Sequence, residues 1–435
     1  IHGWNTDAGY PSNYGGGSFS GPTTLRRAMR QSYNTGAAQA LMYYVGVDRS
    51  VAFLNAMGVK DENLNKDPFG LALGSSGITP MQMAVAFGTL ANGGVYQEPI
   101  SFSKILSSDG DVVVDRRVTQ TRRKVFSEAT AFLTVDMMKG VISDGTGKSA
   151  QIKGQTVAGK TGTNSDYKGI TFTGMTGWYS GSVWIGHDNY KALTSKATGG
   201  NYAAPLWQTI MTKIHEAKGL SNRDIIEKTP EQLGLVRVTT CGVSGQLATD
   251  ACRNDIKGYG TVTDYWPADR APTQTCTMHQ SLPICADSGM LATEYCPNVT
   301  TKGAVILPMG HPLYDYIDQY RDAMRSYLGE FAALKLTQDD AYNQALVSGV
   351  TCTIHSQAWL EEVQQWQQEG TVEEARQLVQ SAYQLLTERG TEISSEAYVS
   401  VSYGIRQVEA ILDSYPMTGL SEAVSNLRYA LSAFN

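Results

Sequence analysis

One short run constrains this chain more than any other: residues 157–163, which read Val-Ala-Gly-Lys-Thr-Gly-Thr. Its apolar and β-branched start predicts a strand that ends in polar groups. On such a strand, Lys160 brings positive charge into a cleft, and the hydroxyls of Thr161 and Thr163 can donate hydrogen bonds to a carboxylate. Gly162 lets a bound backbone lie close against the strand. A plain edge strand that carries a lysine is the alternative interpretation.

A second short motif, Ser32-Tyr33-Asn34, lies at a predicted helix end. A Ser-x-Asn triplet often occurs by chance, and its structural interpretation is a helix C-terminus with a turn-forming asparagine. The order along the chain makes it informative. Ser-x-Asn comes first, the Lys-Thr-Gly strand follows, and an aromatic strand and a closing helix come last.

Residues 1–225 mix helical and strand patterns, which predicts an α+β fold with helices packed on an antiparallel sheet. Thr79-Pro80-Met81-Gln82 has the form of a capping box. Ser127 is expected to cap a helix whose apolar face carries Phe132, Val135 and Met138. The closing helix is predicted at residues 205–217, with a stripe of Leu206, Ile210 and Ile214.

Two segments of the same region have the sequence pattern of β-strands. Residues 100–106 and 111–114 predict a hairpin around an Asp109-Gly110 turn. Residues 178–186 are dense in aromatic and β-branched side chains, which favours a buried strand.

Composition excludes some classes of protein. A chain of 435 residues with a formal charge of -6 does not favour a nucleic-acid partner, which would require a basic face. No apolar run reaches membrane-spanning length. The start at Ile1 predicts a fragment or a processed product rather than a native beginning.

Residues 226–310 contain an internal repeat. Cys241 to Cys252 reads Cys-Gly-Val-Ser-Gly-Gln-Leu-Ala-Thr-Asp-Ala-Cys, and Cys285 to Cys296 follows the same pattern. Each copy is followed by a Cys-Thr-x-His tetrapeptide, at 276–279 and at 352–355. We predict a Cys-containing repeat tail at 226–310, a helical insertion with the end of the second repeat at 311–355, and a helical bundle at 356–435.

The six cysteines leave two interpretations open. Each copy holds three cysteines and one histidine: Cys241, Cys252, Cys276 and His279, then Cys285, Cys296, Cys352 and His355. Disulfides, with Cys276 paired to Cys352 across the repeat, suit an exported protein and are favoured. The alternative is a tetrahedral Cys3His metal site in each copy. The sequence-based expectation is therefore no metal and no cofactor.

At this point the chain resembles a known family, the transpeptidase domains of class A penicillin-binding proteins. The resemblance covers residues 1 to about 220 and rests on several segments in the family's order. These are Gly21-Pro22-Thr23-Thr24-Leu25-Arg26 before Ser32-Tyr33-Asn34, Thr79-Pro80-Met81-Gln82-Met83-Ala84, Asp144-Gly145-Thr146-Gly147, Lys160-Thr161-Gly162-Thr163 and Val183-Trp184-Ile185-Gly186. It implies the antiparallel sheet fold shared with serine β-lactamases.

The resemblance implies acyl transfer through a serine acyl-enzyme on D-Ala-D-Ala stem peptides. Ser32 would relay a proton, Asn34 would position the catalytic lysine and the substrate amide, and Lys160 would set the electrostatics. The hydroxyls of Thr161 and Thr163 would hold the substrate carboxylate, and Gly162 would lie against the substrate. The backbone N–H of Thr163 would form half of the oxyanion hole.

The chain departs from the family at the nucleophile. The family's Ser-x-x-Lys precedes Ser-x-Asn, and no such motif occurs in residues 1–31. Ser101-Phe102-Ser103-Lys104 matches literally, but it lies on the predicted hairpin instead of a helix. We therefore expect an enzyme whose nucleophile is missing from this chain, which makes this piece inactive alone. Thr171-Phe172 also replaces the family's usual Trp-Phe.

The resemblance further implies peptidoglycan stem peptides and β-lactams as ligands, an upstream membrane anchor and glycosyltransferase domain, and a place at the outer face of the membrane. Two other functions remain as alternatives. One is a non-catalytic binder of D-Ala-D-Ala peptides or β-lactams. The other is a β-lactamase, for which no deacylating carboxylate can be assigned.

Overall fold

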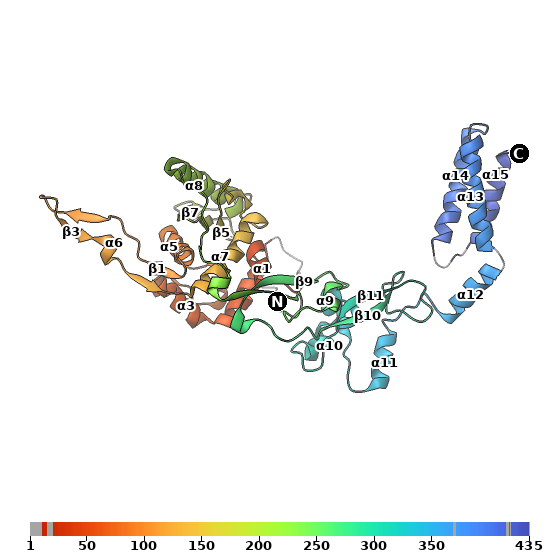
Figure 1. Ribbon diagram of the computed structural model, residues 1–435, viewed down its shortest axis with the longest axis horizontal. Helices are drawn as coiled ribbons and strands as arrows, with labels where there is room; N and C mark the ends of the chain where they lie inside the picture. Colours follow the sequence, from red (N-terminus) through yellow and green to blue (C-terminus); the bar gives the residue numbers. More distant parts are fainter. Residues whose placement is uncertain (1–10, 15–20, 369–370, 415–416, 418, 435) are drawn as a thin grey trace. The chain divides into compact units, whose positions relative to one another are not determined.

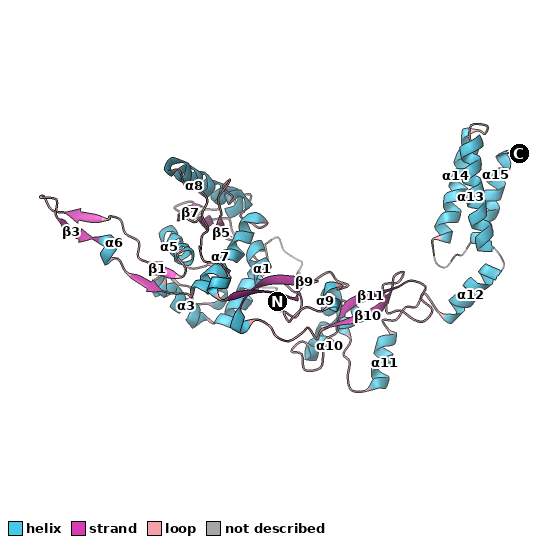
Figure 2. Ribbon diagram, viewed as in Figure 1, coloured by secondary structure: helices cyan, strands magenta, loops and turns pink. Residues whose placement is uncertain are grey.

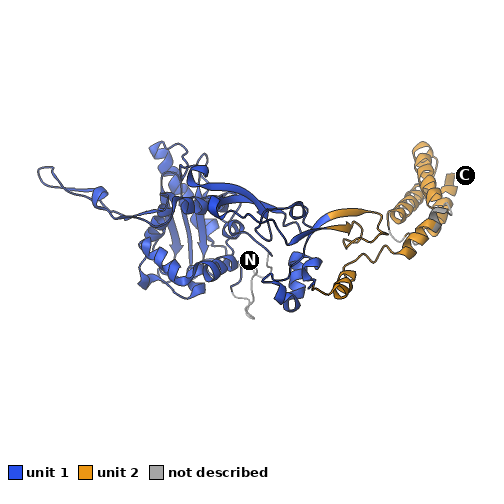
Figure 3. Ribbon diagram, turned by 60° about the horizontal axis from the view of Figure 1, so that its bottom comes forward, with its two compact units in different colours: residues 1–281, 302–336 blue, residues 282–301, 337–435 orange. Residues whose placement is uncertain are grey.

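The computed structural model describes residues 11–14, 21–368, 371–414, 417 and 419–434. The chain divides into two compact units (Figure 3). The first comprises residues 1–281 and 302–336, and the second residues 282–301 and 337–435. The division falls inside the Cys repeat, so each unit holds one set of three cysteines and one histidine. The domain boundaries predicted at 225, 310 and 355 stay predictions.

A three-stranded antiparallel sheet, in the order β5-β6-β7, positions the candidate site in the first unit (Figures 1 and 2). Its strands are β5 (Ala158–Thr163), β6 (Gly169–Met175) and β7 (Ser180–Gly186). Lys160 lies opposite Thr173 on β6, and Thr163 lies opposite Ile170. Short connections join consecutive strands, as in a β-meander. The predicted α+β class is confirmed.

The rest of this region consists of helices and short strands. The helices are α1 (Leu25–Gln31), α2 (Asn34–Gln39), α3 (Val47–Ala56), α4 (Pro68–Leu73), α5 (Pro80–Ala91), α6 (Arg116–Thr119), α7 (Glu128–Ser143) and α8 (Ala204–Lys218). Two antiparallel pairs join β1 (Val95–Gln97) to β4 (Arg122–Lys124) and β2 (Lys104–Leu106) to β3 (Val112–Asp115). The β2–β3 pair is the predicted hairpin, and Gly110 in its turn has a φ of 88°.

Local capping signals fix where two long helices begin. The Thr79 hydroxyl accepts a hydrogen bond from the backbone N–H of Gln82 at 3.2 Å, and the Gln82 side chain accepts from the N–H of Thr79 at 2.9 Å. The Ser127 hydroxyl accepts from the N–H of Thr130 at 3.1 Å. Each bond satisfies a donor that the first turn of a helix leaves unpaired, and both predicted caps are confirmed.

The side chains of β6 alternate between two buried clusters, as expected for a strand with both faces covered. Phe172 belongs to the cluster that contains Trp207 of α8, and the two rings meet edge to face at 5.1 Å. Met175 belongs to the cluster with Val135 and Met138 of α7, as predicted for that helix face. The sheet therefore lies between α8 and α7.

Two expectations about burial were wrong. The predicted stripe of α8 is largely outward, because Leu206 and Ile210 are each 43% exposed. The buried face starts one residue later, with Trp207 and Met211. On β7, Trp184 is 45% exposed, because this strand is last in the sheet order and only partly covered.

The repeat tail begins in the first unit. It forms β8 (Leu235–Cys241), α9 (Asp250–Arg253), β9 (Thr261–Pro267), β10 (His279–Cys285) and β11 (Val299–Val305). The predicted helical insertion forms α10 (Ile317–Leu328) and α11 (Asp340–Ser348). β8 pairs with β9, and β10 pairs with β11. The guanidinium of Arg26 donates hydrogen bonds to Asp264 on β9 at 2.8 Å and to Asp136 on α7 at 2.7 Å. These bonds connect the tail to the sheet domain.

The helices at the C-terminus form the bundle predicted from the sequence. They are α12 (Gln357–Gln368), α13 (Thr371–Arg389), α14 (Ser395–Leu412) and α15 (Leu420–Leu431). The last three share one buried cluster, to which Ala382, Ile405 and Leu427 each contribute from a different helix. Ser394 caps α14 by accepting from the N–H of Ala397 at 3.2 Å.

Candidate active site

Lys160 is the centre of the candidate site. Its ammonium group donates a hydrogen bond to the hydroxyl of Ser32 at 2.6 Å and another to the carbonyl of Thr161 at 3.0 Å. Burial lowers the pKa of Lys160 to about 8, because removing water disfavours the charged ammonium. The two motifs predicted from the sequence therefore meet, although they lie 128 residues apart.

Ser32 reaches Lys160 because helix α1 ends in a left-handed turn. Ser32 has a φ of 58°, its N–H donates to Met29 O, and the N–H of Tyr33 donates to Ala28 O at 2.8 Å. Glycine is the usual residue at such a helix end, since other residues have a strained backbone there. A non-glycine residue in this conformation often marks a functional site.

Asn34 lies beside Ser32 but has a different partner. Its side-chain amide donates to the carbonyl of Ser12 at 2.8 Å, at the start of α2. The neighbouring N–H of Thr35 donates to the side chain of Asn13 at 3.2 Å. Asn34 thereby fixes the segment that precedes α1, and its predicted role toward a catalytic lysine stays a prediction.

The two threonines of β5 are bonded to loops on either side of the strand. The hydroxyls of Thr161 and Thr146 share a hydrogen bond of 2.7 Å. The hydroxyl of Thr163 accepts from the N–H of Gly199 at 2.9 Å. A Cβ on Gly199 would lie 2.6 Å from the carbonyl of Gly162, so only glycine allows this loop to approach the strand.

Sequence reasoning gave no role to Thr146 or Gly199. Thr146 lies in the Asp-Gly-Thr-Gly segment that follows α7, and Gly199 opens η4 (Gly199–Ala203) in Thr-Gly-Gly. The clustered glycines of both loops were the available signal, because glycine marks places where backbones approach closely. Together with β5 and the end of α1, these loops present hydroxyls, backbone N–H groups and one ammonium. Such groups suit a carboxylate ligand.

Comparisons with known proteins agree with this geometry. The model of the penicillin-binding protein transpeptidase domain matches residues 4–212, and that of the C-terminal domain of penicillin-binding protein 1A matches residues 232–281. The chain belongs to the penicillin-binding protein transpeptidase family.

Relatives in this family are similar over part of their length. Penicillin-binding protein 1A of Clostridium perfringens is 31% identical over 278 residues, covering 62% of this chain and 32% of that protein. The Clostridium botulinum protein of the same name is 30% identical over 306 residues, covering 69% of this chain and 36% of that protein. The chain thus spans about a third of the length of these relatives.

A solved structure shares the fold. Penicillin-binding protein 1A from Haemophilus influenzae matches with a TM-score of 0.51 and 24% identity. The match covers 61% of this chain and 43% of that one. At this identity, the likeness supports the penicillin-binding protein fold.

Two literal matches to Ser-x-x-Lys occur after Ser32. Ser101 precedes the exposed β2–β3 hairpin, and Lys104 forms an ion pair with Asp115 at 3.6 Å. Sequence analysis missed the second match, Ser165 to Lys168 in the turn between β5 and β6. Neither pair lies on a helix, which is the arrangement that brings such a serine and lysine onto one face.

Among the described residues, His215 and the cysteines have partners outside this site. His215 is buried and bonded to Thr176 and to the Met211 carbonyl, as expected of a structural residue. All six cysteines are free, so the disulfides favoured by the sequence are absent. They gather instead into two clusters with His279 and His355.

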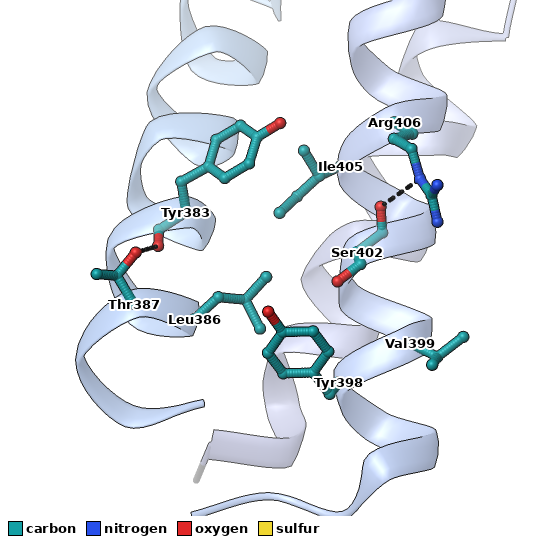
Figure 4. Close-up of a pocket in the computed structure, with 8 residues that line it drawn as sticks. All are labelled: Tyr383, Leu386, Thr387, Tyr398, Val399, Ser402, Ile405 and Arg406. Atoms are coloured by element: carbon teal, nitrogen blue, oxygen red, sulfur yellow. Dashed lines mark hydrogen bonds between the residues drawn. The ribbon is translucent and has the colours of Figure 1, made fainter. Parts of the chain in front are cut away.

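A groove lies in the C-terminal bundle of the second unit, between α13 and α14 (Figure 4). Its lining residues are Tyr383, Leu386, Thr387, Tyr398, Val399, Ser402, Ile405 and Arg406. Arg406 is the single charged side chain among them. The other lining side chains are aliphatic, aromatic or hydroxyl-bearing.

Proposed function

We propose that the protein is a peptidoglycan D,D-transpeptidase that cross-links stem peptides through a serine acyl-enzyme. The 2.6 Å hydrogen bond between Lys160 and Ser32, beside the threonines of β5, is the observation that carries the proposal. This contact supports the proposal because it joins a lysine ammonium on β5 to a hydroxyl that could relay a proton, beside a strand along which an extended peptide could bind.

Each residue has a role in this reaction. Thr161 and Thr163 hold the terminal carboxylate of D-Ala-D-Ala, and Lys160 contributes positive charge. The backbone N–H of Thr163 donates to the oxygen on which negative charge develops. Ser32 passes a proton to the leaving D-Ala, and Asn34 orients the reacting amide.

The nucleophile completes the proposal. A serine hydroxyl attacks the carbonyl between the two D-Ala residues, an ester forms, and the terminal D-Ala leaves with a proton. The amine of a neighbouring stem peptide then attacks the ester, which forms the cross-link and releases the serine. We propose that this serine belongs to a Ser-x-x-Lys motif that is not among residues 1–435.

Partners and location follow from the same proposal. The ligands are stem peptides and β-lactams, and the site of action is the outer face of the cytoplasmic membrane. The whole protein also carries a membrane anchor and a glycosyltransferase domain. Among the described residues, no helix combines the length and the apolar character needed to cross a membrane.

Fluorescent penicillin tests the proposal. The whole protein should take up covalent label on a serine of Ser-x-x-Lys, whereas residues 1–435 alone should take up none. In the whole protein, Lys160→Met should slow labelling by about 10²-fold, the effect expected when an electrostatic group in an active site is lost. Lys153→Met is the matched control, because Lys153 is exposed and near β5.

The outcomes separate the alternatives. Label on Ser101 or Ser165, located by peptide mapping, would overturn the assignment of the nucleophile. Reversible penicillin binding without covalent label in the whole protein would favour a non-catalytic binder. Rapid release of hydrolysed penicillin would favour a β-lactamase.

A further inference from the structure

Each Cys repeat gathers three sulfurs and one imidazole nitrogen around a single point. The ligand atoms of Cys241, Cys252, Cys276 and His279 all lie within 4.8 Å of one another, and all four residues are buried. The atoms of Cys285, Cys296, Cys352 and His355 meet the same limit, with Cys296 partly buried. The first cluster belongs to the first unit and the second cluster to the second unit.

The distances fit tetrahedral coordination of zinc. With Zn–S of about 2.3 Å and Zn–N of about 2.0 Å, a tetrahedron separates sulfur from nitrogen by about 3.5 Å. The Nδ1 atom of His279 lies 3.3 Å from Cys241 Sγ and 3.6 Å from Cys276 Sγ. In the second cluster, His355 Nδ1 lies 3.3 Å from Cys285 Sγ and 3.4 Å from Cys352 Sγ.

Backbone N–H groups point at the sulfurs. The N–H groups of Val243 and Ser244 donate to Cys241 Sγ at 3.3 and 3.4 Å. The N–H of Thr249 donates to Cys252 Sγ at 3.4 Å, and its counterpart on Thr293 donates to Cys296 Sγ at 3.2 Å. Such donors stabilise the negative charge of thiolates bound to a metal.

A carboxylate lies behind each histidine. His279 Nε2 is 3.4 Å from Asp255 Oδ1, both side chains are fully buried, and neither atom has another hydrogen-bond partner in the described structure. His355 Nε2 is 3.5 Å from Asp287 Oδ2. A histidine that ligates a metal through one nitrogen commonly donates its other N–H to a carboxylate. These contacts therefore fix Nδ1 as the atom turned toward the sulfurs.

The backbone builds both clusters in the same way. The N–H of Cys241 donates to Gln246 O at 2.7 Å, and the N–H of Gly245 donates to Cys241 O at 3.0 Å. In the second copy, Cys285 donates to Met290 O and Gly289 donates to Cys285 O, each at 2.9 Å. The repeated turn presents the first cysteine of each cluster in the same orientation relative to its histidine.

We propose that each repeat binds one Zn²⁺ ion through three thiolates and one imidazole. Four protein ligands complete the tetrahedron, so the sites leave no position for substrate water and are structural. Thiolate ligands favour zinc over calcium or magnesium. An odd number of thiols in each cluster also excludes complete pairing into disulfides within a cluster.

Metal analysis tests this proposal on the whole protein, purified without chelators. The expected result is one zinc ion for each cluster, or two for each chain. Cys276→Ser should remove one of them, Cys352→Ser should remove the other, and the double variant should hold none. Thr277→Ala and Thr353→Ala are matched controls, because these exposed threonines stand beside the ligands and should leave zinc content unchanged.

Thiol counting keeps the test decisive if a cysteine variant does not fold. In the unaltered protein, a thiol reagent should react slowly with the six thiols of these clusters before chelator is added and with all of them afterwards. A chain with no metal, or one whose mass shows the loss of two hydrogens for each disulfide, would overturn the proposal. Iron at full occupancy would overturn the choice of zinc. Penicillin labelling does not enter these readouts, so they stand independently of the proposed transpeptidase activity.

Discussion

At the scale of single residues, the site holds two groups in unfavourable states. Lys160 has a buried ammonium whose pKa is lowered to about 8, and Ser32 has a left-handed backbone with a φ of 58°. Their 2.6 Å hydrogen bond gives the ammonium an acceptor in a partly buried position. Such states persist only where the surrounding structure fixes them, and they are concentrated at functional sites.

The lowered pKa of Lys160 predicts a pH dependence of stability. Between pH 8 and the ordinary value of 10.5, the unfolded chain binds more protons than the folded chain, so stability rises with pH in this window. Below it, the charge on the buried ammonium costs about 3 kcal/mol. Lys160→Met should therefore stabilise the chain near neutral pH, and this advantage should shrink between pH 8 and 10.5 and be lost above that range.

Urea unfolding of the variant and the unaltered chain, followed by near-ultraviolet circular dichroism across this range, measures the difference. Lys153→Met provides the control, since the exposed Lys153 should contribute no such dependence. The lowered pKa of Lys160 would be contradicted if Lys160→Met and the unaltered chain differed in free energy of unfolding by the same amount at every pH.

Residues at the site differ in how far the sequence predicts them. Lys160 and Ser32 belong to recognisable short motifs. The order of these two motifs along the chain, which matches the order in the family, predicted that they form one site. Thr146 and Gly199 were missed because their contacts join segments far apart in the chain and follow no periodic pattern. The choice of disulfides failed for a different reason, because it rested on an expected exported location. The alternative grouping of three cysteines with one histidine in each repeat is the one that the structure brings together.

At the scale of elements, Arg26 connects three segments. It lies on α1 and bonds to Asp264 of β9 and Asp136 of α7, while partly buried. The hydrogen bonds that Arg26 donates to Asp264 raise the pKa of Arg26, and they lower the pKa of Asp264 despite its burial. The first helix is thereby joined both to the sheet domain and to the repeat tail.

Arg26→Met should lower the free energy of unfolding of the first unit by about 1–3 kcal/mol, because two partly buried carboxylates lose their cation. The unfolding temperatures of the variant and the unaltered chain measure this loss of stability. Arg27→Met is the matched control on the same helix, since Arg27 is exposed. Equal unfolding temperatures for the two variants would show that the Arg26 contacts contribute little.

Elements with local signals were predicted well. The Thr79 capping box, the Ser127 cap and the hairpin around Gly110 depend on residues within a few positions of one another. The buried face of α8 was not predicted, because Leu206 and Ile210 have the same spacing as Trp207 and Met211. Only contact with Phe172 decides between the two faces, and the larger ring of Trp207 occupies it.

At the scale of the whole molecule, the repeat tail and the sheet domain differ in what holds them together. The sheet has a continuous apolar cluster that includes Phe172, Trp207 and Met211. The cluster around the first repeat includes Cys241, Cys252 and Cys276 themselves. If these cysteines bind zinc, part of the tail's stability is metal-binding free energy, as in other small metal-dependent modules.

Chelation should therefore unfold the tail before the sheet. Limited trypsin digestion after zinc removal should cut first at the exposed Arg253 and Lys257, which lie between the first and third cysteines of the first cluster. Residues 158–186 should remain in a protected fragment, because their core contains no metal ligand. Restoring zinc should restore resistance at Arg253 and Lys257. The same digestion pattern with and without chelator, or first cuts within the sheet, would contradict a tail that depends on metal.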